Sequence, residues 1–281
     1  MAHFPLLRRL AVALGVKPGM VQSYPFMDAA RRRAREGYPE LESVFRAAEP
    51  QFLKVLSAID SYAEDFGRFS GVAPEPRFDQ DWFPPVDGAA AYALTRTAEP
   101  KRIIEIGGGH STRFFQRALK DGSIACAHIV VDPGEKARRK TEGLSVRRIE
   151  SALEDVSLDA LGKFSANDIL SLDGSHMAIP GGDCDGAINR LLPKLPAGAL
   201  VHIHDIFLPD AYPEIWEERP YNEQSLIAAL LQGGGYEPVF SSHYVATRMG
   251  GGAAKTALAR LPRSEKALDS SLWLRKSGKF S

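Results

Sequence analysis

A short apolar segment that runs into three consecutive glycines constrains this chain more than any other feature. Residues 102–106 form the segment, and Gly107, Gly108 and Gly109 follow it directly. Glycine lacks a Cβ atom, so the backbone of such a turn can bend sharply and approach a ligand closely. From Arg113 onward the spacing is helical, which places free N–H groups of the turn at a helix N-terminus. We therefore predict a strand, a ligand-binding turn and a helix, in that order.

Strands and helices are expected to alternate throughout the rest of the chain. Segments with strand character occupy residues 102–106, 128–132, 145–149, 168–173, 199–205, 236–241 and 271–275. Alternation of this kind is typical of a parallel sheet covered by helices on both faces. We predict an α/β fold with a doubly wound, Rossmann-like, seven-stranded and mostly parallel sheet. Ligands bind such sheets at the carboxyl ends of the strands.

The N-terminal part of the chain has a different pattern. Residues 1–80 contain no convincing strand, so we predict a helical extension there and one domain over residues 81–281. The apolar stretch 3–14 contains two arginines, which favours an amphipathic helix over a secretory signal. We expect Asp87 to cap a helix that runs to Thr97.

Composition narrows the range of partners. Lys and Arg together number 35, as do Asp and Glu, so the formal net charge is zero. Without a net field the chain has no electrostatic preference for nucleic acid or an anionic membrane, and we expect a small-molecule partner.

No apolar run approaches the ~18 residues of a membrane span. Cys126 and Cys184 are too few for a disulfide framework, which indicates a reducing cytoplasm. Assembly into a homo-oligomer stays open.

The glycine turn distinguishes between two classes of cofactor. The dinucleotide fingerprint G-x-G-x-x-G requires a third glycine where this chain has Thr112, which disfavours NAD. The pattern E-x-G-x-G that begins at Glu105 resembles the first motif of class I S-adenosylmethionine-dependent methyltransferases, with Ser111 where many members have a third glycine. The resemblance implies that Gly107 and Gly109 pass close to the methionine part of S-adenosylmethionine. It also implies that Glu105 organises the amino-acid end of this cofactor.

A second acid supports this interpretation. Asp132 ends the next expected strand, 27 positions after Glu105. An acid in this place can accept hydrogen bonds from both hydroxyls of a ribose. Alternatively, Asp132 only caps the turn before Pro133, since Asp-Pro often marks turns. The turn and the acid together favour a cofactor site.

Acids and histidines gather at the ends of two later strands. Asp173 and His176 follow the fourth expected strand, and His202, His204 and Asp205 end the fifth. The carboxyl ends of parallel neighbours meet at one edge, so we expect these side chains to converge. His202 lies two residues below the strand tip and is expected to be a hydrogen-bonded core residue. His176, His204 and Asp205 are expected to be functional, because three titratable groups rarely converge at such an edge for packing alone, whereas Asp173 could instead cap the following turn.

These segments together extend the resemblance. The glycine turn, the Asp173-Gly-Ser-His176 segment and residues 195–209 are similar to a bacterial family of class I methyltransferases, the methyltransferase-24 type, over about residues 80–245. The Asp-Gly-Ser-His pattern is also similar to the metal-dependent sugar O-methyltransferases of macrolide biosynthesis.

The second resemblance implies specific roles. Asp173 and Asp205 would bind a divalent ion, with Asp173 also beside the cofactor, and His176 would be the general base. His204 stands where those enzymes have glutamate, so a third ligand or a second base at this position are both open. A mixed set of oxygen and nitrogen ligands suits manganese, iron or zinc at least as well as magnesium.

The chemistry of methyl transfer fits these residue types. Transfer from a sulfonium is an in-line displacement, and a hydroxyl needs a base or a Lewis acid to become a good nucleophile. We interpret the chain as a methyltransferase that acts on an oxygen, less readily a nitrogen, of a small molecule such as a sugar or a secondary metabolite. The alternatives are a non-catalytic cofactor-binding protein, and a metal-dependent hydrolase suggested by the His202-Ile-His204-Asp205 string.

A long aromatic connection, residues 206–222, follows the proposed site. Long loops in compact domains are often functional, so its aromatic side chains could close over an acceptor. Packing against the N-terminal helices is the alternative. Asn222 is expected to cap the next helix, and Trp82 and Phe83 to form the opposite wall of the pocket. The aromatic side chains of the connection are Tyr212, Trp216 and Tyr221.

Overall fold

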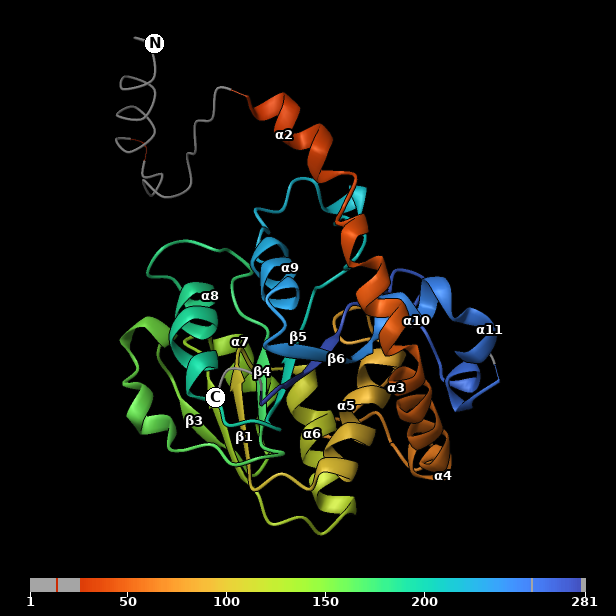
Figure 1. Ribbon diagram of the computed structural model, residues 1–281. Coiled ribbons are helices and arrows are strands. Elements are labelled where there is room, and N and C mark those ends of the chain that lie inside the picture. Colours follow the sequence, from red (N-terminus) through yellow and green to blue (C-terminus); the bar gives the residue numbers. More distant parts are fainter. Residues whose placement is uncertain (1–13, 15–25, 254, 279–281) are drawn as a thin grey trace.

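A single sheet organises the chain. The computed structural model describes residue 14 and residues 26–253 and 255–278 (Figure 1). Within them, seven strands form one sheet in the order β3-β2-β1-β4-β5-β7-β6. The strands are β1 (Arg102–Ile106), β2 (Ala127–Val131), β3 (Arg147–Ile149), β4 (Ile169–Leu172), β5 (Leu200–Ile203), β6 (Tyr236–Ser241) and β7 (Leu272–Lys276).

The sheet confirms the predicted fold class. Each strand lies where the sequence predicts it, to within two residues at either end. The pairs among β1 to β5 are parallel, whereas β7 runs antiparallel to both of its neighbours. β1 and β4 lie side by side in the middle of the sheet, with Ile106 paired to Leu172 at their carboxyl ends. The turns that follow these two strands are therefore neighbours.

Helices cover both faces of the sheet. The helix α5 packs between α6 and α3, and α3 also packs against β6. On the other side of the sheet lie α8 and α9 (Figure 1). No helix of the described ranges is both long and apolar enough to cross a lipid bilayer. The helices are α2 (Met27–Ala34), α3 (Glu42–Ser61), α4 (Ala63–Phe66), α5 (Pro85–Ala98), α6 (His110–Asp121), α7 (Glu135–Lys140), α8 (Asp183–Asp185), α9 (Gln224–Gln232), α10 (Ser242–Arg248) and α11 (Gly250–Ala253).

The N-terminal helices share the core of the sheet. On α3, Phe45 stacks on Tyr244 of α10 at 5.5 Å between ring centroids, and Phe52 meets Phe240 of β6 at 6.1 Å. Burial of such rings provides much of the packing free energy. The helical character predicted for the N-terminal part is confirmed over residues 27–66, whereas residues 67–80 form turns, and the helix predicted over 3–14 falls outside the described residues except at its last position. The domain boundary near residue 80 stays a prediction.

The start of α5 differs from the prediction. The helix begins at Pro85, and proline in the first turn needs no cap for an N–H that it lacks. Asp87 is fully buried, and its carboxylate accepts hydrogen bonds from the N–H groups of Ser270 and Ser271. The prediction that Asp87 caps this helix is therefore wrong, because its side chain turns into the protein.

The turn after β1 requires glycine at its first position. Gly107 has φ +85°, and its N–H donates to the carbonyl of Val131 on β2. A Cβ atom on Gly107 would lie 1.8 Å from the carbonyl oxygen of Asp173, at the end of β4. Any side chain there would force the ends of β1 and β4 apart.

This close approach predicts the effect of a single methyl group. Gly107→Ala should cost at least about 4 kcal/mol in the free energy of unfolding, because the clash adds to an unfavourable backbone angle. Gly181→Ala is the matched control, since Gly181 has φ +82° and a Cβ atom added to it would have no neighbouring atom within 4 Å. This control should cost about 1–2 kcal/mol. Urea denaturation of both variants measures the difference. Equal losses would contradict the described contact between the two strand ends.

Candidate active site

A pocket of about 460 Å³ opens at the carboxyl ends of β1, β4 and β5. The turn after β1, the segment after β4 and the end of β5 form its floor, while residues 215–221 and the segment before α5 form its walls. Of the residues predicted for the site, Glu105, Gly107 and Asp132 do not line this pocket. Those that do are Gly109, Ser111, Asp173, His176, His204 and Asp205.

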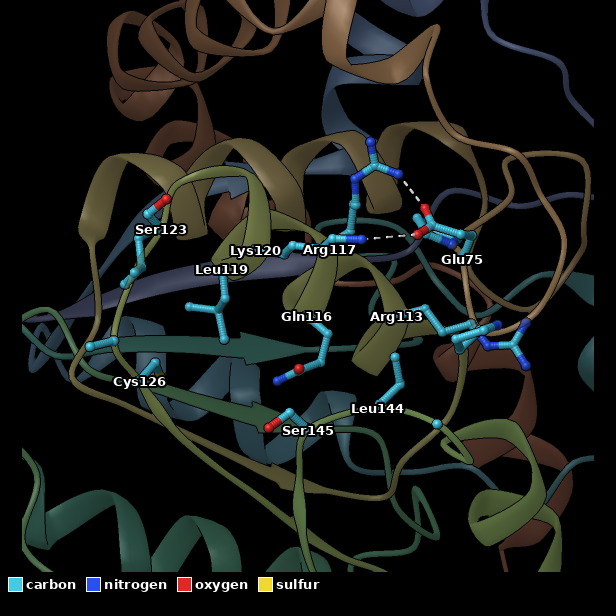
Figure 2. Close-up of a pocket in the computed structure, with 15 residues that line it drawn as sticks. Glu75, Arg113, Gln116, Arg117, Leu119, Lys120, Ser123, Cys126, Leu144 and Ser145 are labelled. Atoms are coloured by element: carbon cyan, nitrogen blue, oxygen red, sulfur yellow. Dashed lines mark hydrogen bonds and ion pairs between the residues drawn. The ribbon is translucent and has the colours of Figure 1, made fainter.

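Another cavity, of about 540 Å³, lies along α6 (Figure 2). Arg117 and Lys120 both point toward Glu75 there and pair with it. Burial raises the pKa of the Cys126 thiol in this cavity to about 12, so the reactive thiolate does not form at neutral pH. Chemistry is therefore expected in the pocket at the strand ends.

Asp132 ties together the turns after β1 and β2. One of its carboxylate oxygens accepts the N–H of Gly108 at 3.0 Å, and the other accepts the N–H of Gly134 at 2.6 Å. The capping role considered from the sequence is thus present. Each carboxylate oxygen retains a second lone pair, so binding of a ribose by Asp132 stays a prediction.

Glu105 lies beneath the glycine turn and has no exposed surface. Its carboxylate accepts the hydroxyl of Ser111 at 2.7 Å and contacts Nε2 of His128 at 2.8 Å. The amide of Gln116 lies 2.8 Å from the other ring nitrogen of His128. If the amide donates there, Nε2 carries the proton that Glu105 accepts. Glu105 thus holds Ser111, which lines the pocket, and its role at the amino-acid end of the cofactor stays a prediction.

Two imidazoles flank a pair of carboxylates at the floor of the pocket. Nε2 of His176 lies 3.4 Å from Asp173 Oδ1 and 3.6 Å from Asp205 Oδ2. Nδ1 of His204 lies 3.6 Å from Asp173 Oδ1 and 3.3 Å from Asp205 Oδ1. The predicted convergence of these four side chains is confirmed. Asp173 keeps 33% of its side chain exposed against 11% for Asp205, so it is the carboxylate that a ligand reaches more easily.

A buried carboxylate holds the far side of each imidazole. Glu223 Oε1 lies 2.5 Å from Nδ1 of His176, and Asp87 Oδ2 lies 3.2 Å from Nε2 of His204. Such outer partners fix the orientation of a ring, so that its other nitrogen faces the pocket. Sequence reasoning missed both carboxylates in this role, because 47 and 117 positions separate the two pairs.

The surrounding charges set the protonation of this cluster. Burial alone would lower the pKa of His176, but Asp173 and Glu223 raise it to about 11. Burial likewise opposes the charge on His204, yet Asp205, Asp173 and Asp87 hold its pKa well above the usual range. Burial would raise the pKa of Asp173, but His204 and His176 lower it well below the usual value.

The shifted pKa values of the two histidines bear on their predicted role as general bases. With both imidazoles protonated at neutral pH, neither His176 nor His204 has a free lone pair to accept a proton. In this protonation state neither imidazole is a ready base, so their role as general bases stays a prediction. Of the two carboxylates between the imidazoles, that of Asp173 is the more exposed and can accept a hydrogen bond from a ligand.

Backbone strain also gathers at this floor. His176 has φ +58° and Asp205 has φ +57°, in the left-handed region that residues with a side chain rarely adopt. Conformations of this kind persist where the surroundings enforce them, often at functional sites.

His202 is fully buried, and the hydroxyls of Ser171 and Ser271 each contact one of its ring nitrogens. Its predicted role in the core is confirmed.

A divalent ion was predicted at Asp173, His204 and Asp205. Carboxylate and imidazole donors suit several such ions. In residues 26–253 and 255–278, however, no three His, Cys, Asp or Glu side chains are arranged to hold one. The imidazole nitrogens instead face the carboxylates as ion-pair partners. The donors are of the right type, but this arrangement does not fit an ion as it stands, so the ion stays a prediction.

The aromatic connection contributes a wall to the pocket. Trp216 and Tyr221 line it, as do Trp82 and Phe83 on the opposite wall predicted from the sequence. Tyr212 does not line the pocket and packs instead against the neighbouring rings of Phe207 and Tyr221. The guanidinium of Arg219, which the sequence did not single out, also lines this wall.

The predicted cap of α9 is wrong. The helix begins at Gln224, with Glu223 at the N-cap position. Asn222 accepts the N–H of Ala178 at 2.6 Å through its side chain and donates its own N–H to the carbonyl of His176. It therefore fastens the aromatic connection to the segment after β4.

Comparison with known proteins gives one sequence match. Residues 104–206 match a family described as a methyltransferase domain. None of the curated proteins matches the chain.

Several solved structures resemble the chain in outline. An S-adenosylhomocysteine-bound methyltransferase from Podospora anserina shares 16% identity over 92% of this chain and 98% of its own, with a TM-score of 0.46. An O-methyltransferase from Bacillus cereus with S-adenosylhomocysteine shares 16% over 78% and 91%, with a TM-score of 0.44. An O-methyltransferase of tomaymycin synthesis from Streptomyces achromogenes, with S-adenosylmethionine, shares 16% over 80% and 90%, also at 0.44. All three TM-scores are below 0.5, so the fold assignment rests on the strand order.

The protonated state of His176 predicts a pH dependence of stability. Its pKa of about 11 in the folded protein exceeds the unfolded value near 6.5, so folding takes up a proton. This contribution is fully present below pH 6.5 and is lost as the pH rises through 11, at no more than about 1.4 kcal/mol per pH unit. His176→Asn, which tolerates the left-handed backbone, should therefore lose less stability than the wild type between pH 6.5 and 10.5 in urea denaturation. Parallel curves would show that His176 is neutral in the folded protein.

Proposed function

We propose that this chain, a class I S-adenosylmethionine-dependent methyltransferase, moves the methyl group to an oxygen, less readily a nitrogen, of a small molecule such as a sugar or a secondary metabolite. One observation carries the proposal: the glycine turn and the ionised cluster face the same pocket. The strand order with β7 antiparallel and the match over residues 104–206 support the choice of donor.

The donor is proposed to lie across the turn between β1 and α6. Gly109 lines the pocket, and a Cβ atom on it would meet only the side chain of Lys140, at 3.6 Å. The glycine is thus not required by the packing of the protein itself. Its bare backbone leaves room for a ligand at the N-terminus of α6.

The acceptor is proposed to place its hydroxyl beside Asp173. The carbon–sulfur bond of the sulfonium breaks as the carbon–oxygen bond forms, and the hydroxyl proton must leave toward the protein or solvent. Asp173 accepts the hydrogen bond of this hydroxyl and aligns its lone pair with the methyl group. His176 and His204 hold the charge and position of Asp173, while Glu223 and Asp87 orient the two rings.

The proposal also includes a divalent ion bound by Asp173, His204 and Asp205. The cluster brings four carboxylates, of Asp87, Asp173, Asp205 and Glu223, together with two imidazoles and the guanidinium of Arg219, so its formal excess is one negative charge. This excess supports a bound cation, although His204 would first have to lose a proton to become a ligand.

The alternatives fit the structure less well. The hydrolase interpretation needs His202 beside His204 as a ligand, but both nitrogens of His202 are used inside the core. A purely cofactor-binding protein has no use for a buried, ionised and strained cluster, which costs folding free energy.

If the donor binds across this turn, two glycine variants should differ in their affinity for S-adenosylhomocysteine. Gly109→Ala should fold with a Tm near the wild-type value but raise the Kd for S-adenosylhomocysteine at least about tenfold, because its methyl group occupies the donor's path. Gly186→Ala, whose Cβ would meet one side-chain atom at 3.7 Å outside the pocket, is the control and should bind normally. Calorimetry measures both affinities. Normal binding by Gly109→Ala would mean that the donor does not cross this turn.

Transfer itself is tested by release of S-adenosylhomocysteine from S-adenosylmethionine in the presence of pooled hydroxylated small molecules. We expect release by the wild type, and a rate of release at least about 100-fold lower in Asp173→Asn.

Treatment with EDTA followed by addition of Mn²⁺ or Zn²⁺ tests the ion. If an ion takes part, the rate should fall with EDTA and recover with the added metal. A rate indifferent to EDTA would remove the ion. No release with any acceptor would favour the non-catalytic alternative.

A further inference from the structure

The entrance of the pocket is positively charged, in contrast to its floor. Lys140, Arg219 and Lys266 line it, and Asp81 is the acid at the same rim. We infer that the acceptor is an anion, and that its carboxylate or phosphate group binds Arg219 while its hydroxyl faces Asp173. The inference rests on the proposed function and names the substrate class of that site.

Arg219 is held in place by two aromatic rings. Its guanidinium carbon lies 3.9 Å from the ring centre of Trp216 and 5.3 Å from that of Tyr221. Stacking of this kind fixes the guanidinium plane but leaves its in-plane N–H donors available. The geometry of these donors matches the oxygens of a carboxylate or a phosphate.

The protein itself only partly satisfies this guanidinium. One nitrogen of Arg219 donates to the hydroxyl of Tyr221 at 3.4 Å, and the same nitrogen lies 3.9 Å from Asp205 Oδ2. The latter distance is too long for a hydrogen bond. The side chain remains 39% exposed at the pocket. An oxyanion of the acceptor would supply the close partner that Asp205 does not.

The two lysines add to the field at the entrance. Neither Lys140 nor Lys266 forms an ion pair within 4 Å with a carboxylate of the described residues, and Lys140 instead lies 5.3 Å from the ring centre of Trp82. Beyond the carboxylates of the floor, these three cations share the pocket lining with one further acid, Asp81. Such a field attracts anions and raises their local concentration.

The floor determines which end of the acceptor enters first. The side chains of Asp173 and Asp205 are carboxylates and would repel a second carboxylate or a phosphate. A hydroxyl can approach Asp173 as a hydrogen-bond donor. Tyr221 connects the two regions, since its ring lies 4.4 Å from that of His176 and also contacts Arg219. The anionic end of the acceptor therefore faces the entrance and the hydroxyl faces the donor.

The test uses pairs of probes in which one member carries an anionic group that the other lacks. Calorimetry on the full chain saturated with S-adenosylhomocysteine compares 4-hydroxybenzoate with 4-hydroxybenzamide, and glucose 6-phosphate with glucose. The first pair reports on a carboxylate and the second on a phosphate. We expect the anion of at least one pair to bind about tenfold or more tightly than its neutral partner, with an affinity that falls as salt is added.

Variants assign this preference to Arg219. Arg219→Met should remove most of the difference within the pair and leave only the contribution of the two lysines, while Arg219→Lys should retain more of it, because the charge remains without the planar set of donors. Arg46→Met, at an exposed arginine of α3 outside the pocket, should leave the preference intact. The Tm of each variant shows that it is folded.

The outcomes separate this inference from the proposed function. Failure of S-adenosylhomocysteine to bind the wild type would contradict the methyltransferase itself. If it binds, then equal affinities within both pairs, no anion binding at 50 mM probe (roughly −2 kcal/mol or weaker), or an anion preference that is undiminished in Arg219→Met would each overturn the anionic acceptor.

Discussion

The close approach of the β1 turn to the end of β4 sets the geometry of the whole site. Gly107 can pass the carbonyl of Asp173 only because it has no side chain. The same contact places the donor turn directly beside Asp173 and, through the parallel register of β4 and β5, beside His204. A requirement of packing thus brings the proposed donor and acceptor groups together. The chemistry depends on strand ends that cannot separate.

The site concentrates several features that oppose stability. Carboxylates and imidazoles are buried together with an excess of negative charge, and His176 and Asp205 adopt left-handed backbone conformations. Each feature costs free energy that the surrounding fold must offset. Glu223 and Asp87 reduce that cost by pairing with the outer side of each ring. A wall with Arg219 and two aromatic rings adds positive charge where the pocket opens. The contrast between an acidic floor and a basic entrance would orient an anionic acceptor with its hydroxyl toward the floor.

Much of this could be predicted from the sequence, because strand patterns are local and parallel strands end at a common edge. That rule places Asp173 beside His204 without knowledge of the fold's details. Sequence patterns do not show which way a side chain turns, so they predict Asp87 at a helix cap, although this side chain is buried. Glu223 could not be found, since nothing in the pattern of a helix start reveals a histidine 47 positions away. The antiparallel direction of β7 likewise depends on the tertiary arrangement.

The most direct test is a crystal structure of the chain with S-adenosylhomocysteine. The account predicts that the ligand lies across Gly109, with its ribose near Asp132 and its sulfur facing the open side of Asp173. The rest of the pocket, toward Arg219, should remain free for an acceptor. A ligand bound elsewhere, or one whose sulfur points away from Asp173, would contradict the claim that donor and reactive groups share one pocket.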